Sequence, residues 1–390
     1  MTDFFEAFDA ERWYFTFMDE EDESRPVQQV GLVAVFYLVD GYLPVRRKGL
    51  AEAFALYHQH YGDKLKGGYR EEPTLRQYSQ KEFEAYIRFI VDTSPMNAVE
   101  FKCLSLPSLG HVSDYMFGTF SPAGWFEQIH KSYTTVRIYL PVEELQGKGK
   151  ARFERFLLQC CELLRPLHGA AGLAIQECHD EEDFQTIEHE TAWAYRGLDV
   201  CTPFAPEAAR NGYRSLNWYT YLAHHWITEL EAERSLRDRL DDERIALLPY
   251  QWGTVIRAGD WPALGKAELD PRPELYVKVN NALRARRVQD IGSLHYGSIE
   301  GEVRFNTRSS NLWLRRFDSA DEVKEAIDQS GQVKTEERQF LRMPSGTPCP
   351  WPGVWICEEK PSLGKQTFRY GMILPKVKGK PVTWRLVKAL

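Results

Sequence analysis

The residues best suited to catalysis in this 390-residue chain lie together between Cys178 and Glu190. His179 and Asp183 are four residues apart, so on a helix they would share a face and could hold a metal ion. A metal-dependent hydrolase built on this cluster is therefore one alternative. Acidic side chains in the first turn of a helix also complement its dipole, and we favour this structural interpretation for a helix that begins near Asp180.

No other stretch has the pattern of a catalytic motif. The sequence contains no HExxH, no GxSxG, no P-loop and no GxGxxG that follows a strand. Its seven cysteines are scattered and form no CxxC pair, which favours a reducing compartment over a disulfide framework. We therefore expect no catalytic residue, no metal site and no cofactor.

A second candidate for chemistry, His168, lies in the segment LLRPLHGAAGLAI. Leu164 is the last position of a helical apolar stripe, and Pro166 disfavours helix at the residue before it. Gly169 can adopt the positive φ that takes the chain out of the turn. We interpret His168 as part of a joint between a helix and a strand, and not as a catalytic base.

The apolar pattern predicts a mixed α/β fold of the α+β class. Between residues 30 and 195, the elements follow the order β-α-β-β-α-β. This is the order of a ferredoxin-like unit, in which two helices cover one face of a four-stranded sheet. The predicted strands are 30–39, 99–106, 134–141 and 170–176, and the predicted helices are 50–61 and 153–164.

A similar order of elements recurs further along the chain, which suggests two pseudo-repeats. Its elements are a strand at 215–222, a charged helix at 229–244, strands at 245–250 and 253–258, a helix after Asp270, and a closing strand at 302–306. Short strands with Gly and Pro turns then indicate a small β module. The predicted domains are an acidic N-terminal lead-in at 1–29, α/β units at 30–195 and 196–317, and a C-terminal β-rich module at 318–390.

The formal net charge of −7 is unevenly distributed. Residues 1–30 carry nine acids and two bases, whereas residues 360–390 carry eight bases and no acid. Because an acidic body does not attract a phosphate backbone, we expect no direct nucleic-acid binding. The basic and aromatic tail from Thr367 to Lys380 leaves a nucleic-acid-binding protein as a second alternative. Edge strands also carry Lys to prevent aggregation, and we favour that explanation of the tail.

No apolar run approaches the ~20 residues that a membrane span needs. The first residues, MTDFFEAFDAERWYF, lack the basic segment and the cleavage site of a signal peptide. We therefore expect a cytoplasmic protein without a membrane partner.

Several motifs, taken in order, resemble those of the type VI immunity family. They span roughly residues 30–290 and comprise Cys103–Ser108 (CLSLPS), Cys161–Ile175 (CELLRPLHGAAGLAI), Tyr213–Leu222 (YRSLNWYTYL), Val255–Gly265 (VIRAGDWPALG) and Tyr276–Arg287. One departure is Lys266, which follows Gly265 where the family has Asp. The segment CPWPGVW at 349–355 resembles a module appended to other toxin-immunity proteins.

The resemblance implies a protein that binds a partner and is not an enzyme. Such immunity proteins neutralise a cognate toxin, delivered between competing bacteria by the type VI secretion system, by covering its active site or substrate groove. We expect one toxin per chain, and a cytosol-acting nuclease as the toxin, since a basic DNA groove suits an acidic binder.

For the toxin contacts we predict acids of the lead-in and of the helix after residue 180. The predicted contact residues are Asp19, Glu20, Glu21, Asp22, Glu23, Asp180, Glu181, Glu182 and Glu188. An anionic run can steer a basic partner, although many such runs are only solvated linkers.

Overall fold

The computed structural model of the chain forms two compact units, and each is described by itself. The first unit comprises Met1–Leu294 and Thr307–Asp318, and the second comprises His295–Asn306 and Ser319–Leu390. The described residues are 2–19, 25–179, 184–200, 207–267, 272–295, 304–319, 342–349, 353–369 and 372–389.

Helices of the described residues are distributed through the whole first unit. The α-helices are α1 (Thr2–Glu11), α2 (Pro44–Tyr61), α3 (Gln80–Asp92), α4 (Gly124–His130), α5 (Gly149–Leu164), α6 (Gln185–Ala194), α7 (His224–Leu230), α8 (Leu236–Leu240), α9 (Glu274–Leu283) and α10 (Thr307–Leu314). The 3-10 turns are η1 (Arg12–Phe15), η2 (Gly62–Lys64), η3 (Val142–Leu145), η5 (Glu207–Arg210), η6 (Arg284–Arg286) and, in the second unit, η8 (Pro361–Leu363).

The strands of the first unit form one eleven-stranded antiparallel sheet in the described residues. Its order is β10-β11-β9-β8-β2-β7-β6-β5-β3-β4, and β1 pairs with β2. The strands are β1 (Phe17–Met18), β2 (Pro26–Leu38), β3 (Gly67–Arg70), β4 (Glu72–Gln77), β5 (Val99–Leu104), β6 (Met116–Ser121), β7 (Thr134–Leu140), β8 (His168–Glu177), β9 (Tyr219–Ala223), β10 (Ile245–Tyr250) and β11 (Gly253–Ala258).

Strand β2 is the centre of the sheet because it pairs with β7 on one side and β8 on the other. Leu32 stands opposite both Leu140 and Leu173. The sequence of β2, PVQQVGLVAVFYL, is a nearly continuous apolar run, and most of the side chains of the strand are buried. A strand covered on both faces requires such a run, since neither face contacts water.

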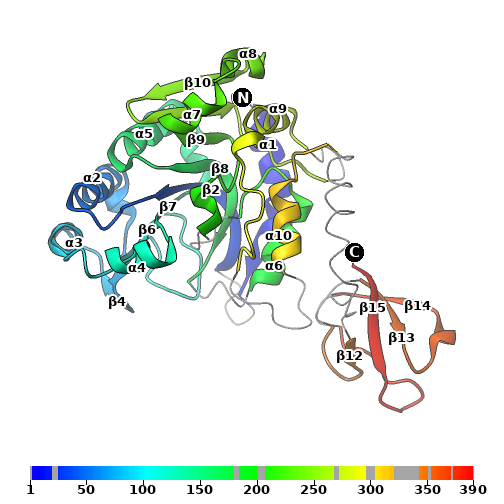
Figure 1. Cartoon of the computed structure of the whole chain (residues 1–390). Helices are drawn as coiled ribbons and strands as arrows, with labels where there is room; N and C mark the ends of the chain where they lie inside the picture. The colour runs from blue at the N-terminus through cyan, green and yellow to red at the C-terminus, as the bar shows by residue number, and fades with distance from the viewer. Residues whose placement is uncertain are drawn as a thin grey trace. The chain divides into compact units, whose positions relative to one another are not determined.

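Helices cover both faces of the sheet (Figure 1): α2, α3 and α5 lie on one side, and α1, α6 and α10 lie on the other. On the first side, the rings of Phe101 (β5) and Phe117 (β6) lie 5.1 and 5.0 Å from that of Phe54 on α2. Gly49 lets α2 approach α5, because a Cβ there would lie 2.3 Å from the carbonyl oxygen of Leu163. The core of the unit is therefore built around an aromatic cluster under two closely packed helices.

The second unit contains a separate antiparallel sheet in the order β12-β15-β13-β14. Buried side chains of Trp355, Trp384, Cys357, Phe368 and Leu374 form its core. The strands are β12 (Arg342–Pro344), β13 (Gly353–Cys357), β14 (Lys365–Phe368) and β15 (Thr383–Ala389). The predicted small C-terminal β module is confirmed.

The mixed α/β class is also confirmed, but the structure does not show separate ferredoxin-like units. Strands and helices occur at all six positions predicted between 30 and 195, yet β6 lies between β5 and β7, and β8 continues the sheet into β9. One continuous sheet thus crosses the predicted boundary at 195/196. Of the predicted closing strand, residues 302–303 lie outside the described residues, and 304–306 form no strand.

No helix of the described residues is both long enough and apolar enough to cross a membrane.

Candidate functional site

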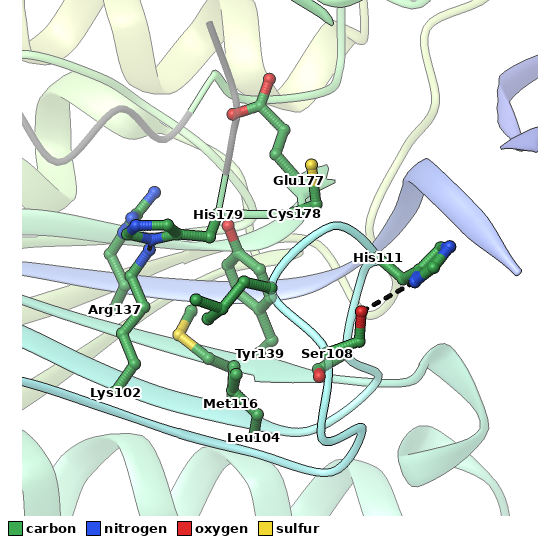
Figure 2. A pocket seen from close by; sticks show the side chains of 12 residues that line it. Lys102, Leu104, Ser108, His111, Met116, Arg137, Tyr139, Glu177, Cys178 and His179 are labelled. Carbon is green, nitrogen blue, oxygen red and sulfur yellow. Dashed lines mark hydrogen bonds between the residues drawn. The ribbon is translucent and has the colours of Figure 1, made fainter. Parts of the chain in front are cut away.

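A polar pocket lies on the face of the sheet that points away from α2. Phe101 contacts α2, so its neighbour Lys102 projects to the opposite face. There Lys102, Arg137 of β7 and His179, which follows β8, line two adjoining hollows of about 20 and 140 Å³ (Figure 2). Lys102 Nζ lies 3.0 Å from His179 Nδ1, and the Tyr69 hydroxyl lies 3.5 Å from the same nitrogen. Glu177 lines the first hollow and Glu100 the second, so the pocket combines charges of both signs on a platform of strands.

This pocket contains the first part of the 178–190 cluster but does not assemble a metal site from the residues described. Cys178 is 4% exposed, and Figure 2 shows the Glu177 carboxylate pointing away from the His179 ring. Asp183, the proposed second ligand, lies outside the described residues. Within those residues, no group of three or more His, Cys, Asp or Glu side chains is placed to hold a metal ion.

A serine, a histidine and a carboxylate also meet at the rim of the pocket. Ser108 Oγ and His111 Nδ1 are 2.8 Å apart (Figure 2), and His111 Nε2 lies 3.6 Å from Asp19 Oδ2. The second distance is longer than a hydrogen bond, so the set lacks the tight relay of a hydrolytic triad. Its consequence is structural, because it ties Asp19 to the loop before β6.

The predicted toxin contacts are only partly within the described residues. Asp19 is half-buried beside His111, and its backbone N–H donates to the carbonyl of Arg25 at 3.1 Å. Glu188 lies on α6 and is only 1% exposed. A partner could not reach it in this conformation, so it does not belong to a docking surface. The remaining predicted contacts, Glu20–Glu23 and Asp180–Glu182, lie outside the described residues.

His168 is the first residue of β8 and is completely buried. Its ring packs 4.7 Å from that of Tyr37 and 5.7 Å from that of Trp226. The interpretation as a helix-to-strand joint fits this position, but the turn is made differently. Arg165, and not Gly169, adopts the left-handed conformation with φ 50° after α5. Gly169 is needed for a close approach, since its Cβ would lie 2.2 Å from the carbonyl oxygen of Val35.

The acidic lead-in contains a helix that the sequence interpretation missed. The ring of Phe4 on α1 stacks on that of Trp261 at 5.2 Å, and Phe8 is 1% exposed. Lys266, the departure from the family motif, forms an ion pair with Glu11 at 2.8 Å. The apolar spacing of the three phenylalanines in TDFFEAFDAE is the signal that predicts such a helix.

Helix α4 reverses the usual burial pattern of a surface helix. Its Glu127 is 1% exposed and accepts hydrogen bonds from the backbone of Asp40 at 2.5 Å and from Arg210 at 2.9 Å. Burial raises the pKa of Glu127 above its usual value. Trp125 and Ile129 are exposed instead. The buried carboxylate of Glu127 therefore joins α4 to the turn after β2 and to Arg210 of η5.

The C-terminal tail has exposed lysines but no exposed ring among its described residues. Lys376, Lys378 and Lys380 are exposed around a tight turn. Phe368 is only 6% exposed, and its ring packs 4.9 Å from that of Trp384. Base stacking, on which the nucleic-acid alternative depends, therefore has no platform in this part of the tail.

Comparison with known families identifies the first unit. A family model described as type VI immunity for VRR-NUC, TsiV, matches residues 49–317. The chain belongs to this family. The predicted resemblance is confirmed, and TsiV membership makes the chain an immunity protein directed against a VRR-NUC nuclease toxin, with no enzymatic role implied.

A solved structure shares the TsiV fold of this chain. The Pseudomonas aeruginosa T6SS protein PA0821 superimposes with a TM-score of 0.69 at 22% sequence identity, covering 82% of this chain and 91% of that chain. At this identity, the likeness concerns the fold alone. The comparison with curated proteins returned no match.

Proposed function

We propose that this TsiV protein binds its cognate VRR-NUC toxin directly, one to one, and covers the active site or the substrate groove of the toxin. The proposal places the complex in the cytoplasm, where a nuclease toxin finds DNA. The observation that carries it is the charge of the chain, −7 overall and concentrated in acids near the N-terminus. A nuclease holds DNA phosphates with Lys and Arg, so an acidic protector is complementary to the groove itself.

The acids that we assign to the contact surface are Asp19–Glu23 and Asp180–Glu182. Asp19 is close to the polar pocket, since it pairs with His111 at its rim. Glu188 is left out because it is buried. Both segments would bring negative charge to a basic groove, which increases the association rate more than the lifetime of the complex.

The test is a nuclease assay with the purified toxin domain and the full-length chain. We expect cleavage of a DNA duplex to fall linearly with added chain and to stop at one equivalent. We also expect DNA and the chain to compete for the toxin, because both would occupy the same groove. A ternary complex of toxin, DNA and chain, or full cleavage at saturating chain, would rule out occlusion of the groove.

A further inference from the structure

We propose that Trp13 is the central contact of the surface that docks on the basic groove of the VRR-NUC toxin. This inference rests on the proposed function and assigns it a place on the molecule. We use the name Trp13 surface for the exposed residues Glu6, Asp9, Trp13 and Tyr14 of α1 and η1, together with Glu143, to which Arg12 joins them.

Trp13 is the most exposed large hydrophobic side chain among the described residues. It is 83% exposed, and the adjacent Tyr14 is 64% exposed. Tryptophan has more apolar area to bury than other side chains, and Trp and Tyr dominate the binding energy of protein interfaces. Two such neighbours left in water indicate a surface that a partner covers.

The backbone under Trp13 is held in place before any partner arrives. Phe8 and Phe15, which flank it in sequence, are 1% and 0% exposed, and their rings lie 5.2 Å apart. The ring of Phe15 also packs on Tyr195 at 5.5 Å. Since η1 is anchored on both sides of Trp13, binding does not have to order this segment first.

The bases near Trp13 are neutralised within the chain. The Arg12 guanidinium lies 3.0 Å from Asp9 and 2.5 Å from Glu143. Lys266 pairs with Glu11 at 2.8 Å. The carboxylates of Asp9 and Glu143 nevertheless remain 64% and 47% exposed, so the surface offers negative charge to a partner. In sequence, it leads directly into the acids of Asp19–Glu23.

An exposed indole on a segment that also carries exposed carboxylates fits a partner surface rich in Arg and Lys. A guanidinium or ammonium within about 6 Å of the ring face is attracted by the ring, most strongly by that of tryptophan. The exposed carboxylates of the Trp13 surface would pair with other cations of the same groove. A surface rich in Arg and Lys is what a nuclease uses to bind phosphates. The partner that fits the Trp13 surface is therefore the toxin, and not a second copy of this acidic chain.

The test compares two exposed tryptophans of the full-length chain. We expect W13A to raise the Kd for the toxin domain by about thirtyfold or more, the loss typical of a central interface residue. W125A, on α4, is the matched control, and we expect its Kd to stay within about twofold of the wild type. Both variants should melt at the same temperature as the wild type, since Trp13 and Trp125 are exposed.

A second pair of variants tests the charge around Trp13. We expect E6Q to slow association at about 50 mM salt more than E84Q, a matched change on α3, and the difference to disappear at high salt. Light scattering should show a monomer for both the wild type and W13A.

The inference and the proposed function fail in different ways. If the wild type neither binds nor inhibits the toxin, the proposed function is wrong. If the wild type binds and W13A binds equally well, only the Trp13 surface is excluded, and a loss with W125A would move the interface to α4. A wild-type dimer that W13A dissociates would make a second copy the occupant, and would overturn the inference.

Discussion

At the scale of single residues, His168 shows how the fold determines the chemistry of a side chain. It is completely buried, and its ring lies between those of Tyr37 and Trp226. Burial, with a smaller contribution from the charge of Arg214, lowers the pKa of His168 from 6.5 to about 3. A histidine that stays neutral across the physiological range is a poor proton shuttle, which agrees with a structural role.

The depressed pKa of His168 predicts an acid-sensitive fold. In the unfolded chain the ring takes up a proton as the pH falls below 6.5, whereas in the folded chain it does so only near pH 3. Acid therefore favours the unfolded state, and the free energy of unfolding should fall by up to about 1.4 kcal/mol per pH unit between those values.

Urea denaturation at several pH values measures this slope. We expect H168Q to reduce the slope between pH 6 and pH 4 by about one proton, whatever its stability at neutral pH. H130Q, which changes an exposed histidine on α4, is the control and should keep the wild-type slope. Parallel curves for H168Q and the wild type would mean that His168 is not the group responsible.

At the scale of elements, α10 and the turn after it return the chain to the first unit through a buried ion pair. Arg287 donates to both carboxylate oxygens of Asp318, at 2.7 and 2.6 Å, and Asn280 donates to Asp318 at 2.8 Å. Both charged side chains are under 8% exposed. Removing one partner leaves the other charge buried without its counterion, which is strongly destabilising.

We therefore expect D318A to lower the free energy of unfolding by about 3 kcal/mol or more. The matched control is R315A, because Arg315 is only half-buried and its guanidinium donates a long hydrogen bond to the carbonyl of Gln289, at 3.3 Å. Its effect should stay within about 0.5 kcal/mol. Chemical denaturation of the full chain checks both variants. A free energy of unfolding of D318A equal to that of the wild type would mean that the ion pair gains no more than its own desolvation costs.

Among the elements, local helices can be predicted from the sequence, whereas the pairing of distant strands cannot. Helix α3 was missed although its signal is present: Phe83, Tyr86 and Ile90 are spaced for one face, and Ser79 caps the helix by accepting from the N–H of Glu82 at 3.2 Å. The single sheet was not predictable in this way. The insertion of β6 beside β7 and the pairing of β8 with β9 are long-range contacts that no local pattern encodes.

The candidate surface was harder to predict than the fold. Trp13 stands among the aromatic residues of FDAERWYFTF, and tryptophans are mostly well buried, so the sequence gives no sign that this one is 83% exposed. Glu188 shows the opposite error, since an acid in a helix is usually exposed and this one is buried. Exposure depends on which face a helix turns to the sheet, and only the packed structure decides it.

At the scale of the whole molecule, charge is segregated along the chain. Residues 342–389 contain nine bases and two acids, whereas the chain as a whole carries −7. The total field felt by a distant partner and the local field at the lead-in can therefore differ. Separating the two requires variants that share a net charge but differ in where the acids are removed.

Replacing Asp19–Glu23 with serine changes the net charge from −7 to −2. If the lead-in steers the toxin, we expect the association rate of this variant to fall severalfold at low ionic strength. Attraction over more than about 10 Å, the Debye length at about 0.1 M salt, is lost only when the salt concentration is that high. The control neutralises five exposed acids elsewhere and reaches the same net charge of −2: Glu52, Asp63, Glu71, Glu72 and Glu84. Stopped-flow association across a salt series separates the outcomes. Equal slowing in both variants would assign steering to the overall charge, and an unchanged rate and salt dependence in the serine variant would remove the lead-in from the interface. A loss confined to the serine variant would assign the steering to the acids of the lead-in.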